Sequence, residues 1–275
     1  GARFAKRLFR ETTPVSLPCL SRRASAQLSP SIALARRVSR RGIDGAHLSV
    51  ALGHDAAPPT GFAKLGRAFV INLERRTDRM ATFMETAAGA GITNVTVVRG
   101  VPHECGLLGL TLAHITALQQ CWASPWVDSC LIMEDGFAVR LPPGNATALI
   151  DSFLRDVPTW DVLMLSCNLQ FYMHEYLPGH ACPPYAVRVA KGMSAAGYVV
   201  RREYAPNITS TLIGAVPWLR AECSIRFAND VTWIELQRSD LWFTMHHADM
   251  RRGIIGYQAP SYSDVQHANV DSGVR

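Results

Sequence analysis

The sequence predicts an α/β domain in which a mainly parallel sheet is flanked by helices. Short apolar runs alternate with segments of helical periodicity from residue 68 to residue 165, a pattern typical of βαβ units. The content of 48% hydrophobic and 18% charged residues is that of a folded globular protein. In addition, the apolar run of residues 130–133 stops at Glu134 and Asp135, as expected where a strand reaches the ligand-binding edge of an open sheet.

The first half of the predicted domain contains three strands separated by two helices. The first helix should begin at Thr77 or Asp78, which can cap it, and end at Gly89 or Gly91. Its apolar stripe consists of Met80, Phe83, Met84, Ala87 and Ala88. The strands are expected at residues 68–71, 95–98 and 130–133, and the second helix at residues 106–121.

The second half of the domain is less regular. A helix near residues 147–154 should precede a strand at residues 162–165. Two further strands are expected at residues 187–190 and 197–200, and a helix at residues 203–212.

The positive charge of the chain is concentrated near its beginning. Residues 1–45 contain ten Lys and Arg residues but only two acids, although the whole chain has a net charge of +6. Residues 54–61 have the composition of a linker. We therefore divide the chain into a largely disordered basic leader, stem or targeting segment at residues 1–60 and a folded domain at residues 61–275.

The cysteines and glycosylation triplets do not assign the protein to one cellular compartment. The seven cysteines are widely spaced and form no metal or redox motif. Asn94, Asn145 and Asn207 begin formal glycosylation triplets, which favour a secretory location weakly. No apolar run approaches the roughly 18–20 residues of a membrane helix, so membrane association would need the basic leader or a segment upstream of Gly1.

The Glu134-Asp135 pair is the strongest candidate for a functional site. Buried acids are costly unless a metal or a basic partner neutralises them. The alternative is that the two acids only cap a helix or face water.

Several segments, taken in order, resemble the family 25 glycosyltransferases, which include bacterial lipopolysaccharide sugar transferases and collagen galactosyltransferases. The segments are residues 69–79 (FVINLERRTDR), 109–114 (GLTLAH), 131–136 (LIMEDG), 160–165 (WDVLML), 197–200 (GYVV), 230–233 (DVTW) and 258–264 (QAPSYSD). Two positions depart from the family pattern: Ala113 stands where the family usually has Ser, and Gly136 stands where it has a third acid.

The resemblance implies a GT-A, Rossmann-like nucleotide-sugar domain that transfers a sugar to an acceptor hydroxyl with inversion. The expected donor is a UDP-sugar, and the acceptor is a glycan or a protein. Glu134 and Asp135 are the implied ligands of Mn²⁺ or Mg²⁺, which prefer oxygen ligands. Because Gly136 removes one carboxylate, a catalytically impaired relative that only binds a nucleotide sugar, glycan or protein remains the alternative.

The other candidate residues follow from the same segments. Donor binding is assigned to Asn72, Arg75, Arg76, Arg79 and His114, together with the acid pair, and Asp230 is the predicted catalytic base. For each there is a structural alternative: a solvated helix start for the arginines, a core position for His114, and a structural hydrogen bond for Asp230.

Two further groups have weaker support. His246, His247 and Asp249 could hold a phosphate or supply one metal ligand, and Trp233, Trp242 and Tyr262 could stack on a sugar, although such aromatics are more often core residues. A nucleic-acid partner is not expected, because the basic leader nearly lacks aromatic residues.

Overall fold

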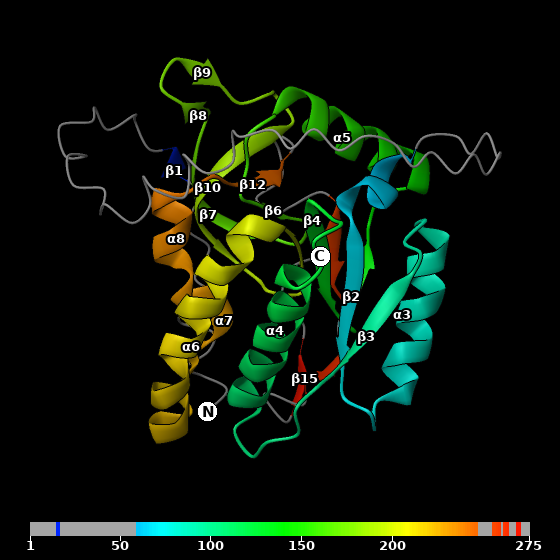
Figure 1. Cartoon of the computed structure of the whole chain (residues 1–275), viewed down its shortest axis with the longest axis vertical. Coiled ribbons are helices and arrows are strands. Elements are labelled where there is room, and N and C mark those ends of the chain that lie inside the picture. Colours follow the sequence, from blue (N-terminus) through cyan, green and yellow to red (C-terminus); the bar gives the residue numbers. More distant parts are fainter. Residues whose placement is uncertain (1–14, 17–58, 247–254, 260, 264–267, 271–275) are drawn as a thin grey trace, which may run out of the picture. The chain divides into compact units, whose positions relative to one another are not determined.

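The computed structural model describes residues 15–16, 59–246, 255–259, 261–263 and 268–270 (Figure 1). These residues belong to one compact unit formed by residues 1–17 and 59–275. A second unit, residues 18–58, lies outside the described residues, as do His247 and Asp249.

A nine-stranded sheet forms the centre of this unit, and its strand order is β1-β7-β10-β12-β6-β11-β4-β2-β3. The strands are β1 (Val15–Ser16), β2 (Arg67–Asn72), β3 (Val95–Arg99), β4 (Ser129–Glu134), β6 (Val162–Met164), β7 (Asn168–Met173), β10 (Ala186–Met193), β11 (Gly197–Arg201) and β12 (Trp242–Met245). The α/β class is confirmed, but the sheet is mixed rather than mainly parallel. The difference arises because β11 runs antiparallel to both β4 and β6, and β10 antiparallel to both β7 and β12.

Helices cover both faces of the sheet. Alternate residues of β2 show this: Phe69 and Ile71 belong to the core cluster that also contains residues of α4 (Gly106–Trp122) and α6 (Ala205–Glu222). Ala68 and Val70 belong to the cluster that contains residues of α3 (Thr77–Gly89) and α5 (Pro143–Asp156). Because strand side chains point alternately to opposite faces, a strand buried on both faces is apolar throughout, as residues 68–71 are.

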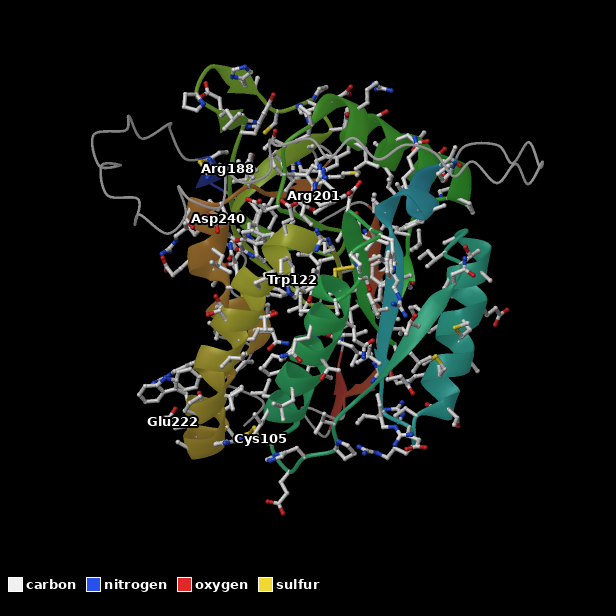
Figure 2. The ribbon with its side chains drawn as sticks, in the orientation of Figure 1. Cys105, Trp122, Arg188, Arg201, Glu222 and Asp240 are labelled. Atoms are coloured by element: carbon white, nitrogen blue, oxygen red, sulfur yellow. A yellow bond between two sulfur atoms is a disulfide. The ribbon has the colours of Figure 1, made fainter. Side chains whose placement is uncertain are left out.

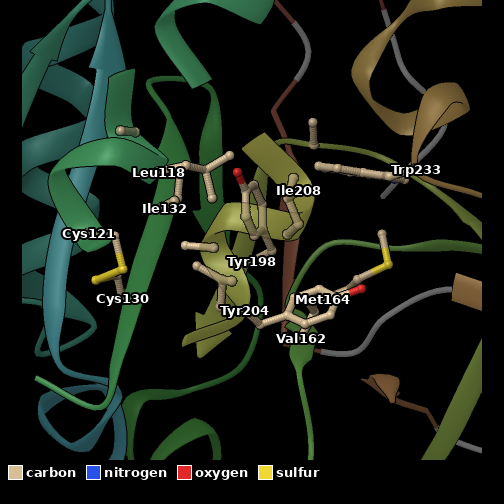
Figure 3. Close-up of a cluster of buried hydrophobic side chains, with 14 of the residues drawn as sticks. Leu118, Cys121, Cys130, Ile132, Val162, Met164, Tyr198, Tyr204, Ile208 and Trp233 are labelled. Atoms are coloured by element: carbon tan, nitrogen blue, oxygen red, sulfur yellow. A yellow bond between two sulfur atoms is a disulfide. The ribbon is translucent and has the colours of Figure 1, made fainter. Parts of the chain in front are cut away.

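The α4–α6 face has an aromatic centre. Tyr198 of β11 is fully buried and packs edge-on against Trp233, with 5.4 Å between ring centroids. Figure 3 shows Tyr198 among Leu118, Ile132 and Ile208. Trp233 in turn contacts Trp242, at 5.3 Å between centroids, and neither tryptophan is exposed. These two tryptophans are therefore core residues, the more frequent role expected for them, and they are not available to stack on a sugar.

Two disulfides link elements of the same face. Cys105, at the N-terminal end of α4, pairs with Cys223, which follows Glu222 at the end of α6 (Figure 2). The second disulfide joins Cys121 of α4 to Cys130 of β4. The spacing of the cysteines gave no sign of either pair, since both depend on how α4 packs in three dimensions.

The predicted elements are present, with shifted ends. The largest shift is in α6, which continues to Glu222 through Pro217 instead of ending near residue 212. Strands β7 and β12 were not predicted. The remaining short elements are η1 (Gly61–Leu65), η2 (Arg202–Tyr204), η3 (Ile225–Phe227), α7 (Asn229–Thr232), α8 (Ile234–Ser239), β5 (Phe137–Val139), β8 (Glu175–Leu177), β9 (His180–Ala181), β13 (Gly256–Gln258), β14 (Ser261–Ser263) and β15 (Ala268–Val270).

Two observations bear on the predictions about membrane association and about the basic leader. Within the described residues, no helix has the length and apolar character needed to cross a membrane. Residues 15–16, inside the predicted leader, pair in parallel with β7 as strand β1. The division of the chain into a leader at residues 1–60 and a folded domain stays a prediction.

The turn at Gly66 gives a test of backbone constraint. Gly66 has φ 79°, and a Cβ added there would lie 1.9 Å from the carbonyl oxygen of Ser129. Gly91 has the same φ but no atom within 4 Å of an added Cβ. We expect Gly91→Ala to lower the free energy of unfolding by about 1–2 kcal/mol through backbone strain alone, and Gly66→Ala to lower it by more than about 3 kcal/mol. Urea denaturation of both variants measures the difference, and equal losses would contradict the collision with Ser129.

Candidate functional site

The candidate site lies at the edge of the sheet where β2 and β4 end. These strands are parallel and in register, with Ile71 opposite Glu134, and the Asp135 amide donates to the Ile71 carbonyl over 3.1 Å. The turn before β11 reaches the same edge, since the Glu134 amide donates to the Ala196 carbonyl over 2.8 Å. Residues from distant parts of the sequence therefore meet here, as is usual at the carboxyl edge of an α/β sheet.

Asp135 forms a buried ion pair at this edge. Its Oδ1 contacts the guanidinium Nη2 of Arg79, from the first turn of α3, and its Oδ2 accepts a hydrogen bond of 2.7 Å from Asn72 Nδ2. The side chain of Asp135 is only 8% exposed. Burial raises the pKa of Asp135 to about 6, and the positive charge of Arg79 and the Asn72 hydrogen bond oppose that rise.

The space beside Gly136 is filled by Arg79. A Cβ added to Gly136 would lie 3.0 Å from Arg79 Nη2 and 3.7 Å from Cγ of Gln258. Gln258 belongs to β13, which pairs with β5, and the Ala259 amide donates to the Gly136 carbonyl over 2.8 Å. Gln258 and Ala259 therefore lie against the Glu134-Asp135-Gly136 junction, and Gln258 is 122 residues from Gly136 in sequence.

Glu134 points toward the other face of the sheet, where it meets His114 of α4. The Oε1 of Glu134 lies 3.4 Å from His114 Nε2, too long for a strong hydrogen bond. His114 is fully buried, and its Nδ1 is 3.1 Å from the hydroxyl of Tyr198. Burial and the negative charge of Glu134 raise the pKa of Tyr198, so the phenol stays protonated in this row of three side chains.

Asp230 of α7 lies close to the same row. Burial raises its pKa, the charge of Glu134 raises it further, and the charge of His114 opposes the rise. Its Oδ2 accepts a hydrogen bond of 3.1 Å from the backbone N–H of Ser194. Ser194 has φ 115°, a conformation that non-glycine residues seldom adopt, and such strain is often found at functional sites.

The structure brings together most, but not all, of the predicted site residues. Asn72, Arg79, His114, Glu134, Asp135 and Asp230 surround this edge of the sheet. Arg76 pairs with Asp78 over 2.9 Å at the start of α3, the structural role that was the alternative to donor binding. The charge of Arg76 also opposes the rise in the pKa of Asp135. Arg75 is exposed. The roles assigned to these residues stay predictions.

Three residues of the site were missed from the sequence. Tyr198 and Gln258 lie inside two of the segments that resemble family 25 glycosyltransferases, so the sequence could have marked them as candidates. Their contacts could not be predicted from the sequence. Ser194 carries no signal in the sequence, because its importance comes from its backbone conformation and from its contact with Asp230. Of the predicted phosphate cluster, only His246 is described, and its ring packs against Tyr172.

The acid pair does not fit a shared divalent cation. Both oxygens of Asp135 already have partners, one of them a guanidinium, and Asp135 and Glu134 serve different faces of the sheet. Across the described residues, no group of three His, Cys, Asp or Glu side chains is placed to hold a metal ion. The assignment of Glu134 and Asp135 as metal ligands is a prediction that these contacts do not support.

Comparison with known proteins gives distant structural likenesses. No family model and no curated protein sequence matches the chain. Among solved structures, A197 from STIV matches with a TM-score of 0.39 and 9% identity, covering 74% of this chain and 95% of that one. A glycosyltransferase involved in the glycosylation of the major capsid of PBCV-1 matches with a TM-score of 0.33 and 13% identity, covering 67% and 94%.

A third structure, 4-diphosphocytidyl-2C-methyl-D-erythritol synthase from Anaerococcus prevotii, has a TM-score of 0.35 and 8% identity, covering 67% of this chain and 89% of that one. These scores and identities are low, so the likenesses carry no argument about activity. The side chains at the sheet edge are therefore the features that bear on function.

The raised pKa of Asp135 predicts a pH-dependent contribution to stability. A carboxyl whose folded pKa of about 6 exceeds its unfolded value of 3.8 stabilises the fold fully below about pH 4, and loses that contribution as the pH rises through 6. We expect the unfolding free energy of the wild type, minus that of Asp135→Asn, to fall by up to about 3 kcal/mol between about pH 4 and pH 7. Asn at residue 135 does not titrate, so the pH-independent effects of the substitution cancel from this slope. Denaturant titrations at several pH values measure it, and a difference that grows with pH would show that Arg79 outweighs burial.

Proposed function

We propose that this protein is an inverting glycosyltransferase that moves a sugar from a nucleotide sugar to an acceptor hydroxyl. The observation that carries the proposal is the convergence of separate sequence segments at one sheet edge. Asn72, His114, Glu134-Asp135, Asp230 and Gln258 come from five segments that resemble those of family 25 glycosyltransferases, and all of them lie around the ends of β2 and β4. We also propose that the domain is of the GT-A type, which binds nucleotide sugars.

The donor side of the site contains Asn72, Arg76 and Arg79. Four residues, 73–76, separate the end of β2 from the start of helix α3, so the N-terminal N–H groups of α3 lie near the same edge. Helix N-termini and arginine side chains both favour bound phosphate. We assign the diphosphate of the donor to this side, with a UDP-sugar as the favoured donor.

The acceptor side contains Asp230, Glu134 and His114. In an inverting transfer the acceptor oxygen attacks the anomeric carbon, the bond from that carbon to the diphosphate oxygen breaks, and a base removes the proton of the hydroxyl. We assign this proton to Asp230, because burial raises its pKa toward the range of an effective base. Ser194 would position the carboxylate through its N–H.

An oxidising, secretory compartment is the location we propose. Of the two disulfides, Cys121–Cys130 is fully buried, whereas Cys105–Cys223 joins a buried cysteine to an exposed one. Structural disulfides persist mainly outside the reducing cytosol. Asn94, Asn145 and Asn207, which begin the glycosylation triplets, are all exposed. We propose a glycan or a protein as the acceptor in that compartment, and no nucleic-acid partner.

A binding module without transferase activity is the second candidate. The position of Arg79, which contacts Asp135 and fills the space beside Gly136, favours a binding module. Asp135 was expected to be a metal ligand, but its charge is already neutralised by Arg79. A panel of nucleotide sugars, assayed for hydrolysis and transfer with and without Mn²⁺, separates the two candidates. Binding without turnover of any donor would select the binding module.

Replacement of the predicted base tests the proposed reaction. We expect Asp230→Asn to lower the transfer rate by about 10²- to 10⁴-fold with little change in donor affinity, because only proton removal is lost. Asp161→Asn is the matched control: Asp161 Oδ2 also accepts a backbone N–H, from Leu241 over 2.9 Å, but it precedes β6 at the opposite edge of the sheet. If both variants lose activity equally, Asp230 has a structural role and the assignment fails.

A further inference from the structure

The positive charge at the acid junction is supplied by the protein itself. Asp135 and Glu134 are adjacent acids at the end of β4, the kind of pair that often holds a divalent cation together with phosphate. Here the guanidinium of Arg79 lies against Asp135 Oδ1, while Asn72 donates to Oδ2. Asp135 and Arg79 are only 8% and 15% exposed, so water screens their attraction weakly.

Gly136 leaves the guanidinium of Arg79 undisturbed in this position. An added Cβ at this position would come within 3.0 Å of Nη2 and 3.9 Å of Cζ of Arg79. A side chain at residue 136 would therefore require the end of the Arg79 side chain to shift by a few tenths of an ångström. The glycine that removes one carboxylate from the expected metal site thus also leaves a permanent cation undisturbed.

A divalent cation at this junction would compete directly with Arg79. To reach Asp135 it would have to enter beside a like charge in a poorly screened position. Glu134 cannot compensate, because it lies on the α4 side with His114. The side chains therefore favour the resident guanidinium over a bound metal ion.

We propose that Arg79 takes the place of the divalent cation: Asp135 is the counter-ion of Arg79 and not a metal ligand, and nucleotide binding at this edge requires no metal. The inference rests on the proposed function only for its second half, the nucleotide. The first half concerns the protein and Mn²⁺ alone.

Mn²⁺ titration of the full chain, followed by electron paramagnetic resonance without any nucleotide, tests the first half. We expect the wild type to show no saturable Mn²⁺ site below 1 mM (roughly the weak end of protein affinities for oxygen-ligated cations). Arg79→Met should bind Mn²⁺ more tightly than the wild type, because Asp135 then lacks its guanidinium partner. Arg79→Lys should not, because it keeps the charge. Arg75→Met is the matched control, since it removes one arginine charge from the same segment at an exposed position.

A saturable Mn²⁺ site in the wild type that disappears in Asp135→Asn would overturn the inference. This test needs only the wild type and Asp135→Asn, so it stands even if Arg79→Met fails to fold.

Calorimetric titration with UDP tests the second half. We expect the dissociation constant in EDTA and in Mn²⁺ to agree within about twofold, and to rise at least tenfold in Arg79→Met, about 1.4 kcal/mol. Binding that tightens tenfold or more with Mn²⁺ would overturn the inference while leaving the proposed function intact. If UDP and other nucleotides fail to bind in either condition, the proposed function fails, and the Mn²⁺ titration alone decides the role of Arg79.

Discussion

The buried ion pair of Asp135 with Arg79 joins three elements whose relative positions define the site. Asp135 follows β4, Arg79 lies in the first turn of α3, and Asn72 at the end of β2 completes the group through Asp135 Oδ2. Loss of one partner would leave a charge buried without compensation, at a cost of about 3–5 kcal/mol. This cost fixes α3 against the end of β4, and so it also fixes the space beside Gly136 that Arg79 fills.

The alternation of strand side chains divides the site into two halves. Ile132 belongs to the core cluster of α4 and α6, and Met133 to that of α3 and α5. Continued by two residues, this alternation sends Glu134 toward His114 and Asp135 toward Arg79. The two adjacent acids therefore have different partners. Asp135 lies with Arg79, a cation suited to binding a diphosphate. Glu134 lies with His114 and near Asp230, a group suited to proton transfer.

Local sequence patterns predicted most of the helices and strands, but not which of them pack against one another. Strand β2 and helix α3 were predictable because each has its own periodicity, and the acids were placed correctly because an apolar strand must stop where they begin. The antiparallel course of β11, the disulfide between Cys105 and Cys223, and the strained contact of Ser194 with Asp230 depend on tertiary packing. In contrast, the sequence could have predicted that Glu134 and Asp135 point to opposite faces of the sheet, because this follows from the alternation of strand side chains alone.

Gly136 and Arg79 are best understood as one structural unit. From the sequence, Gly136 marks the loss of a carboxylate and, by implication, of a metal ligand. In the structure the same position borders the guanidinium that neutralises Asp135. Removing an acid and adding a cation both make the junction less negative, so the two features act in the same electrostatic direction. Residues that share a contact in this way are energetically coupled, and the effect of a side chain at residue 136 should therefore depend on which residue occupies position 79.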